Sequence, residues 1–294
     1  MKHDKRDSRE VGLEILHLAL RHHPGSNHLH YGYWEQGLEP TIANLPKAQE
    51  AYCRFLLSHI PEGTQSILDV GCGTGALARS LQDAGYDVEC ISPSRAFKRY
   101  AEELLDEGTP IHECYYEDFA PQRPFDLVLF SESFQYMKLE QALEKTLDVM
   151  KEDGRLMICD FFKTGAPGKS PMGGGHKMHR FSRAIEKQQL ELVEDIDITD
   201  KTAPTMKIVN DMLLSVASPA RDLVFDFLHK RHPFLTRFFE WSFRKKLKKA
   251  ERKYFSGQKT PEIFAKYKTY RLFVFARSSA QPGRSPSAAF RGQT

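Results

Sequence analysis

The sequence has few cysteines, and their spacing is as informative as their number. Five occur among 294 residues, an odd count, and no two have the C-x-x-C spacing. A disulfide framework or a cysteine zinc site is therefore not expected, and a reducing cytoplasm is the natural setting. The five are Cys53, Cys72, Cys90, Cys114 and Cys159.

Long apolar runs and an excess of one charge are also missing. No stretch reaches the roughly 18 uncharged apolar residues that a membrane span needs. The opening MKHDKRDSRE has no apolar run behind it, so a secretory signal is not expected. Lys and Arg number 42 and Asp and Glu 39, a net charge of +3. This balance argues against a general nucleic-acid binder, and we expect a cytoplasmic protein.

The middle of the chain alternates short apolar runs with helical patterns. The runs cover residues 66–70, 87–91, 111–115, 125–130 and 155–161. Strands and helices that alternate in units of roughly 25–35 residues predict an α/β fold, a parallel sheet with helices on both faces.

A glycine-rich turn follows the first predicted strand, in the run Asp69-Val-Gly-Cys-Gly-Thr-Gly75. Glycines there let the backbone turn tightly and let a ligand approach closely, outside the carboxyl end of the strand. Gly71, Gly73 and Ala76 also fit the dinucleotide pattern, so an NAD-dependent oxidoreductase has to be weighed.

Two features count against the dinucleotide. The charge of Asp69 would repel a pyrophosphate but attract a cationic cofactor that carries an amino acid. The second strand ends in Cys90-Ile-Ser-Pro-Ser94, without the carboxylate that would hold an NAD ribose.

The run ILDVGCGTG resembles motif I of class I S-adenosylmethionine (SAM) dependent methyltransferases, and the resemblance covers roughly residues 65–163. It implies a Rossmann-like, seven-stranded, mostly parallel sheet whose last strand, within 272–276, is antiparallel. The sequence CISPS and the segment His30-Tyr-Gly-Tyr-Trp34 resemble cyclopropane-fatty-acid synthases and tocopherol methyltransferases, where the aromatic segment closes over SAM.

The resemblance implies a set of SAM contacts. Asp69 and the glycines would hold the methionine end, Asp118 and Phe119 the adenine, Ser92 the ribose, and Tyr31 and Tyr33 would cover the sulfonium, since electron-rich rings attract cations. A hydrophobic staple between two helices is the alternative role of the tyrosines. The cofactor-binding residues expected are Tyr31, Tyr33, Asp69, Gly71, Gly73, Gly75, Ser92, Asp118, Phe119 and Ser131.

Glu132, at the carboxyl end of the fourth strand, is the leading catalytic candidate, because it could orient the acceptor or balance a developing cation. Its alternative role is a charge at a helix N-terminus. Tyr136 follows on the next turn, and His176 lies in a lid-like loop, where a solvated histidine is the ordinary alternative. No metal site is expected, because His28/His30 and His176/His179 lack carboxylate or cysteine support nearby in the sequence.

The stretch 205–256 has a helical pattern rich in Phe, Leu and Met, and such helices usually cap the active site of this fold. They would line an apolar acceptor pocket or pack as an added core layer. The basic run 244–253 follows aromatic residues, so 238–253 would contact an anionic membrane surface or form a solvated helix face. The predicted divisions are 1–60, a helical and aromatic lid; 61–163, the SAM-binding core; 164–270, a loop and helical cap; 271–277, the final strand; and 278–294, a disordered tail.

These patterns predict a SAM-dependent methyltransferase that acts on a small, lipophilic acceptor at carbon, oxygen or nitrogen. The alternatives are an NAD-dependent oxidoreductase and a non-catalytic SAM-binding scaffold. An RNA or protein target is a further alternative, and the Asn/Asp-Pro-Pro-Tyr-like and cysteine-based catalytic motifs of many RNA enzymes of this fold are absent from the sequence. The acceptor and the oligomeric state do not follow from the sequence.

Overall fold

A single sheet organises the chain, for which a computed structural model describes residues 8–22, 25–168, 170–188 and 190–278. Within this part, seven strands lie in the order β3-β2-β1-β4-β5-β7-β6. The strands are β1 Ser66–Val70, β2 Asp87–Ile91, β3 Ile111–His112, β4 Phe125–Ser131, β5 Met150–Lys163, β6 Leu190–Asp197 and β7 Lys268–Arg277. Neighbouring strands from β3 to β5 are parallel, and β7 runs antiparallel to both β5 and β6. The predicted fold class is therefore confirmed.

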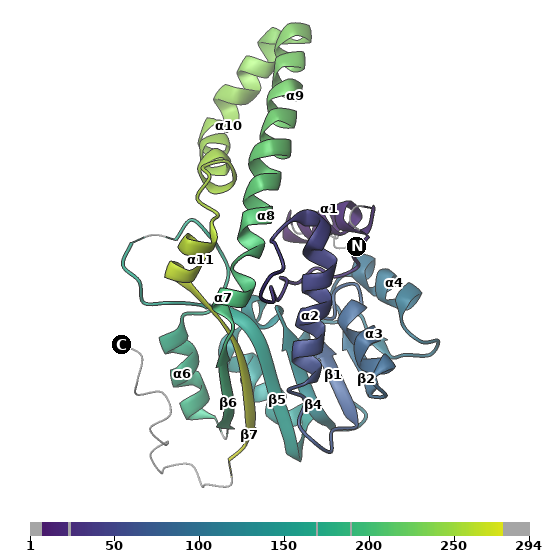
Figure 1. The fold of residues 1–294 in the computed structure, drawn as a ribbon. Helices are drawn as coiled ribbons and strands as arrows, with labels where there is room; N and C mark the ends of the chain where they lie inside the picture. Colours follow the sequence, from purple (N-terminus) through teal and green to yellow (C-terminus); the bar gives the residue numbers. More distant parts are fainter. Residues whose placement is uncertain (1–7, 23–24, 169, 189, 279–294) are drawn as a thin grey trace.

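Helices cover both faces of this sheet (Figure 1). Successive residues of β1 and β4 point to opposite faces, as strand geometry requires. Ile67 and Leu127 join one apolar cluster with α2, α3 and α11, whereas Leu68 and Val128 join another with α5 and α6. The longer helices are α1 Ser8–His22, α2 Leu45–Leu57, α3 Ala76–Asp83, α4 Arg95–Leu104, α5 Leu139–Val149, α6 Met178–Lys187, α8 Thr205–Met212, α9 Ser218–Arg231, α10 Pro233–Tyr254 and α11 Pro261–Tyr267.

Several predicted boundaries differ from the structure, since β5 begins at Met150 rather than residue 155 and β7 at Lys268 rather than residue 271. The third strand ends at His112 rather than residue 115, because the chain turns after it into a short 3-10 helix, η2 Tyr116–Asp118. The predicted cap, 164–270, contains α6 and β6, and both belong to the core, because β6 pairs with β7 and α6 packs in the apolar cluster on one face of the sheet. Of the predicted tail, 278–294, only Ser278 lies within the described residues.

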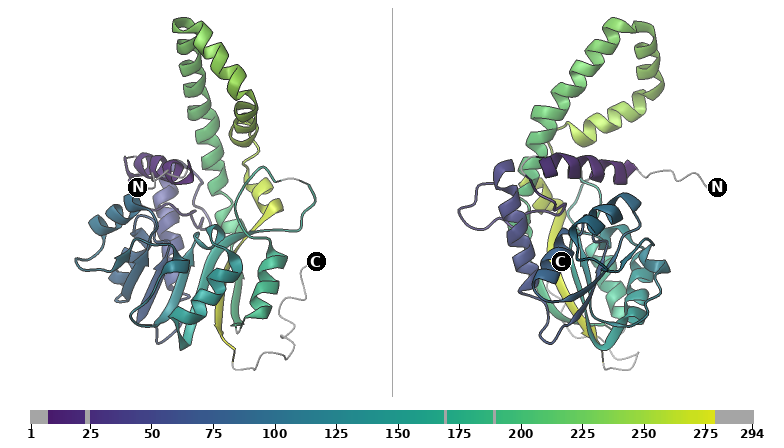
Figure 2. Two further views of the ribbon diagram at one scale, coloured as in Figure 1. Left: turned by 180° about the vertical axis from the view of Figure 1, so that it is seen from behind. Right: turned by 90° about the vertical axis from the view of Figure 1, so that its right-hand side faces the viewer.

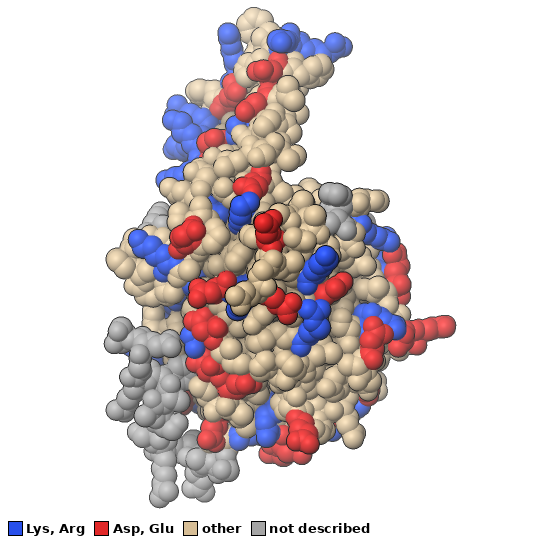
Figure 3. All heavy atoms as spheres, in the orientation of Figure 1, with Lys and Arg blue, Asp and Glu red and all other residues tan. Residues whose placement is uncertain are grey.

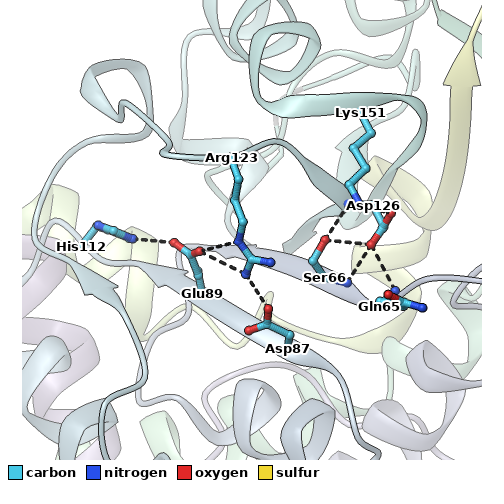
Figure 4. A network of polar contacts seen from close by, with 8 residues as sticks. All are labelled: Gln65, Ser66, Asp87, Glu89, His112, Arg123, Asp126 and Lys151. Atoms are coloured by element: carbon cyan, nitrogen blue, oxygen red, sulfur yellow. Dashed lines mark hydrogen bonds and ion pairs between the residues drawn. The ribbon is translucent and has the colours of Figure 1, made fainter.

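Ion pairs and hydrogen bonds join the strands at their amino-terminal side (Figure 4). Asp126 on β4 accepts hydrogen bonds from the backbone and the hydroxyl of Ser66 at 2.9 and 2.8 Å and forms an ion pair with Lys151 at 2.7 Å. Burial opposes ionisation of this carboxyl, but the ion pair and the hydrogen bonds together lower its pKa. Asp126 therefore ties the start of β1 to β5.

A helical hairpin rises from the carboxyl-terminal side of the parallel strands and projects away from the body (Figures 1 and 2). It consists of α8, a π-helical turn at Leu213–Ala217, α9 and α10. The predicted helical stretch 205–256 is confirmed, but its predicted packing is not. The side chains of Phe234 and Leu235 are 84% and 69% exposed, so they neither form a core layer nor close over the body. None of the helices in the described ranges has the length and apolarity of a bilayer span.

The base of the hairpin is anchored in the aromatic N-terminal segment. The hydroxyl oxygen of Thr205 accepts hydrogen bonds from the indole of Trp34 at 3.0 Å and from the backbone of Gly32 at 3.1 Å. Gly32 is required here, because a Cβ at this position would lie 2.6 Å from the Cβ of Ala48. These hydrogen bonds therefore attach the base of the hairpin to the N-terminal segment, which borders the site described next.

Candidate active site

A cavity of about 430 Å³ opens at the carboxyl ends of β1, β2 and β4. Its wall is formed by the turns after these strands and by the N-terminal segment, including Leu13 of α1 and His28, Leu29 and His30. In open α/β sheets this edge is where ligands bind. The predicted N-terminal lid thus borders the cavity.

The glycine turn forms the floor of the cavity. Gly71 and Gly73 line it, with φ angles of 82° and 56°, which favour glycine. A Cβ on Gly71 would lie 2.6 Å from the Cβ of Ser133, so the turn also needs glycine for space. Gly75, at φ 83°, faces the backbone of Ala101 instead of the cavity, and it therefore shapes the turn rather than the wall.

Asp69 is a buried carboxylate on the cavity wall. Its side chain is 1% exposed, and its Oδ2 atom has no hydrogen-bond partner. Burial raises its pKa to about 7. An unpartnered buried oxygen is costly unless a ligand supplies a donor, so this atom fits a bound ammonium group.

The turn after β2 supplies hydroxyl groups and aromatic surface. Ser92, Ser94 and Phe97 line the cavity, and the hydroxyl of Ser94 caps α4 by accepting a hydrogen bond from the backbone of Phe97 at 3.3 Å. Tyr115 lines it from the loop after β3.

The structure does not bring Asp118 and Phe119 to the cavity. Asp118 is exposed at the end of η2, and the ring of Phe119 is buried against that of His112, at 4.7 Å between centroids. The physical reason is the early end of β3, because the loop that follows presents Tyr115 to the cavity and turns Asp118 away.

The predicted tyrosines also lie behind the wall rather than on it. Tyr31 packs among the rings of Phe161, Phe264 and Tyr270, and Tyr33 stacks on Phe55 at 5.0 Å. Both rings pack against the apolar core, and because Phe161 and Tyr270 lie on β5 and β7, Tyr31 does not join two helices as a staple either. The same segment instead presents His28, Leu29 and His30 to the cavity. Which side chains of this segment face the cavity is decided by its irregular backbone, which has no regular periodicity.

Glu132 occupies the wall at the end of β4. Its φ angle is 54°, rare for a residue other than glycine, and backbone strain of this kind gathers at functional sites. One carboxylate oxygen, Oε1, accepts hydrogen bonds from the backbone of Tyr31 at 2.6 Å and from the hydroxyl of Tyr270 at 2.7 Å. Burial raises the pKa of Glu132 to about 8.

The neighbours of Glu132 differ in their relation to the cavity. Ser131 lines it, and its hydroxyl lies 3.1 Å from that of Tyr52. Tyr136 lines it too, with 55% of its side chain exposed. His176 does not reach the cavity, since its Nε2 lies 3.1 Å from the carbonyl oxygen of Phe134 and its ring packs on that of Phe134.

Several residues of this site were not expected from the sequence. Tyr52 and Tyr270 lie 218 positions apart, yet their hydroxyl groups are 3.1 Å apart behind Glu132. The carboxylate of Asp160 on β5 accepts a hydrogen bond from the backbone N–H of Gln135 at 2.9 Å. No local pattern marks these positions, because strand pairing and helix packing alone bring them together.

Comparisons with known proteins relate this chain to methyltransferases. Residues 68–158 match a family model described as a methyltransferase domain. An uncharacterized methyltransferase from Staphylococcus carnosus is 26% identical over 153 residues, which is 51% of this chain and 70% of the relative. An O-methyltransferase from Pyrenophora dematioidea is 28% identical over 211 residues, 64% of this chain and 77% of the relative.

Solved structures share the fold at lower identity. Geranyl diphosphate C-methyltransferase from Streptomyces coelicolor A3(2), in complex with Mg²⁺, a substrate analogue and S-adenosylhomocysteine, matches with a TM-score of 0.63 and 17% identity, covering 89% of this chain and 92% of that one. The [4+2]-cyclase SpnF matches with a TM-score of 0.64 and 18% identity, covering 92% and 95%. Because this fold also carries a cyclase, the assignment of activity depends on the family model and the sequence relatives.

The comparisons support neither the oxidoreductase nor the scaffold alternative. The family match agrees with the strand order and with the glycine turn that ends β1. Residues 68–158 are thus the methyltransferase domain of a class I SAM-dependent methyltransferase.

Proposed function

We propose that this enzyme transfers the methyl group of SAM to a small, lipophilic acceptor in the cavity at the carboxyl ends of β1, β2 and β4. The unpartnered Oδ2 of Asp69 carries the proposal, because it fits the ammonium group of the methionine end. Gly71 and Gly73 leave the backbone open beside it. The hydroxyl groups of Ser92 and Ser94 suit a ribose, and Phe97 and Tyr115 suit the flat adenine ring.

SAM, when bound, supplies a methyl group already activated by its sulfonium. The protein then has to align the acceptor and exclude water. Glu132 suits this task, because two hydrogen bonds fix its carboxyl group on the wall. The positive charge of bound SAM would favour its ionised form, which can accept a hydrogen bond from the acceptor or balance positive charge that develops on it. Tyr136, next to it on the wall and more exposed, would contact the acceptor as it enters.

Calorimetry with SAM tests the site. Asp69→Ala should weaken SAM binding at least tenfold, about 1.4 kcal/mol, because it removes the partner of the ammonium group. Asp83→Ala, on the exposed end of α3, should leave affinity unchanged. Glu132→Gln should bind SAM normally but lose about 100-fold in turnover to S-adenosylhomocysteine, measured with a lipid extract as acceptor source. Equal affinity of Asp69→Ala and the wild type would refute the placement.

The hairpin supports a lipophilic acceptor reached at an anionic membrane surface. Phe234, Leu235, Phe238 and Trp241 on α10 are each at least 65% exposed, a concentration of apolar surface that marks an interaction site. Seven of the ten residues from 244 to 253 are Lys or Arg. Figure 3 shows basic side chains gathered on the projecting hairpin. Aromatic side chains beside basic ones suit the interface of an anionic bilayer.

Vesicle sedimentation tests this surface. The enzyme should bind vesicles that contain phosphatidylglycerol and not vesicles of phosphatidylcholine alone. Phe234→Ser with Phe238→Ser, and separately Lys245→Glu with Lys248→Glu, should weaken binding at least about tenfold. Val193→Ser, at another exposed apolar side chain on β6, should bind like the wild type. Binding that ignores lipid charge, or a stable dimer in light scattering that the Phe substitutions dissociate, would contradict the membrane assignment.

A further inference from the structure

We infer that His28, His30 and Cys53 form a zinc site on the wall of the cavity. The Nδ1 atom of His28 and the Nε2 atom of His30 lie 3.0 Å apart. The sulfur of Cys53 lies 3.8 Å from the first nitrogen and 3.5 Å from the second. Zinc takes both thiolate sulfur and imidazole nitrogen as ligands in proteins, so all three atoms are suitable donors.

The spacing of the three atoms suits a tetrahedral ion. Zinc bonds of about 2.0–2.1 Å to nitrogen and about 2.3 Å to sulfur place tetrahedral ligand atoms about 3.3–3.6 Å apart. The observed separations, 3.0, 3.5 and 3.8 Å, bracket this range. An ion would therefore be accommodated by shifts of a few tenths of an ångström.

The surrounding hydrogen bonds orient the ligands. The Nδ1 atom of His30 lies 2.8 Å from the carbonyl oxygen of Tyr31, so it carries the proton and leaves the Nε2 lone pair facing the other two ligands. The side-chain amide of Gln49, 1% exposed, donates to the carbonyl oxygens of His28 and His30 at 3.2 and 2.8 Å. The ring of Tyr52 stacks on that of His30 at 4.3 Å. A carbonyl partner on the second ring nitrogen is the usual environment of a zinc-bound histidine.

The proposed zinc site has three protein ligands and adjoins the cavity. His28 and His30 line the cavity, whereas Cys53 is buried behind them on α2. Three protein ligands with a fourth position left for water or substrate are the pattern of catalytic zinc sites. The fourth position would thus take an oxygen, nitrogen or sulfur atom of a molecule in the cavity.

Cobalt titration of the metal-free full-length enzyme tests the site, because Co²⁺ reports its geometry by visible absorption. One equivalent should give the intense bands of tetrahedral Co²⁺ with a thiolate-to-cobalt charge-transfer band, and Zn²⁺ should displace it. Cys53→Ser should abolish the charge-transfer band, and His28→Gln should weaken cobalt binding at least tenfold. Cys114→Ser and His179→Gln should behave as wild type, since both residues lie outside the cluster. Weak, octahedral-type bands, or identical spectra from Cys53→Ser and Cys114→Ser, would overturn the assignment.

X-ray absorption of the zinc-loaded wild type provides a test that needs no variant. The zinc should show one sulfur at about 2.3 Å together with nitrogen and oxygen neighbours. A shell without sulfur would show that the three side chains are only a hydrogen-bonded cluster. Metal binding is also separable from the proposed methyl transfer, because Asp69→Ala should lose SAM affinity and keep the cobalt spectrum.

Discussion

Three buried carboxyl groups link the stability of this enzyme to pH. Burial raises the pKa of Asp69 and Asp160 to about 7 and that of Glu132 to about 8. In the unfolded chain such groups ionise near pH 4. Between these values the folded state holds more protons than the unfolded state, so the free energy of unfolding falls as pH rises.

Replacement of Glu132 isolates one of these groups. Glu132→Gln keeps an oxygen that can accept the hydrogen bonds from Tyr31 and Tyr270 but cannot ionise. Its free energy of unfolding should fall less steeply between pH 5 and 8 than that of the wild type, by at most about 1.4 kcal/mol per pH unit. Urea denaturation across this range measures the slope. Glu144→Gln, an exposed carboxylate on α5, serves as control, and a slope unchanged by Glu132→Gln would show that this carboxyl is ionised in the folded enzyme.

At the scale of elements, polar side-chain contacts away from the cavity join neighbouring strands of the sheet. Asp126 holds Ser66, which is 3% exposed, whereas Asp87 pairs with Arg123 at the surface, at 2.6 Å (Figure 4). The two carboxylates differ in their partners and in burial, because Asp126 accepts hydrogen bonds from backbone N–H groups, a hydroxyl group and Lys151, whereas Asp87 contacts Arg123. Burial decides which of these two contacts stabilises the fold more. When the acceptor is removed, a buried donor cannot bind water in its place, whereas an exposed donor can.

Alanine substitution at the two positions compares these ties. Asp126→Ala leaves the buried backbone donor of Ser66 unpaired and should lower the free energy of unfolding by about 2–4 kcal/mol. Asp87→Ala removes a solvated ion pair and should cost less than about 1 kcal/mol. Urea denaturation at neutral pH measures both. Equal losses would mean that the buried hydrogen bonds of Asp126 are compensated elsewhere.

At the scale of the whole molecule, the hairpin is firmly anchored at its base and exposed at its tip. Thr205 joins it to Trp34, 171 positions away, through a buried hydrogen bond. Four apolar residues of α10 are each at least 65% exposed and so make few contacts with the body: Phe234, Leu235, Phe238 and Trp241. The base therefore contributes to stability, and the tip is free for an interaction.

Thr205→Val and Phe234→Ser distinguish base from tip. Thr205→Val removes the acceptor of two buried donors, in Gly32 and Trp34, and should cost about 2–4 kcal/mol. Phe234→Ser should change stability by less than about 0.5 kcal/mol and leave SAM affinity unchanged. Thermal denaturation and calorimetry measure these effects. A large loss of stability in Phe234→Ser would place its ring in a packed contact.

The sequence by itself determined the alternation of strands and helices, the glycine turn, Asp69 beside it and Glu132 at the end of the fourth strand. These features are local, because strand periodicity, the positive φ of glycine and the position of a residue after a strand are properties of a few neighbouring residues.

Only the tertiary structure decided which side chains of the loops reach the cavity. It put Tyr115 in the place expected of Asp118, turned Tyr31 and Tyr33 inward, kept His176 away, and left the aromatic side chains of the hairpin in solvent. It also brought Cys53 of α2 to His28 and His30, where the sequence showed only two histidines without a third ligand. Such contacts depend on the packing of an irregular segment against a distant helix, which no local pattern encodes.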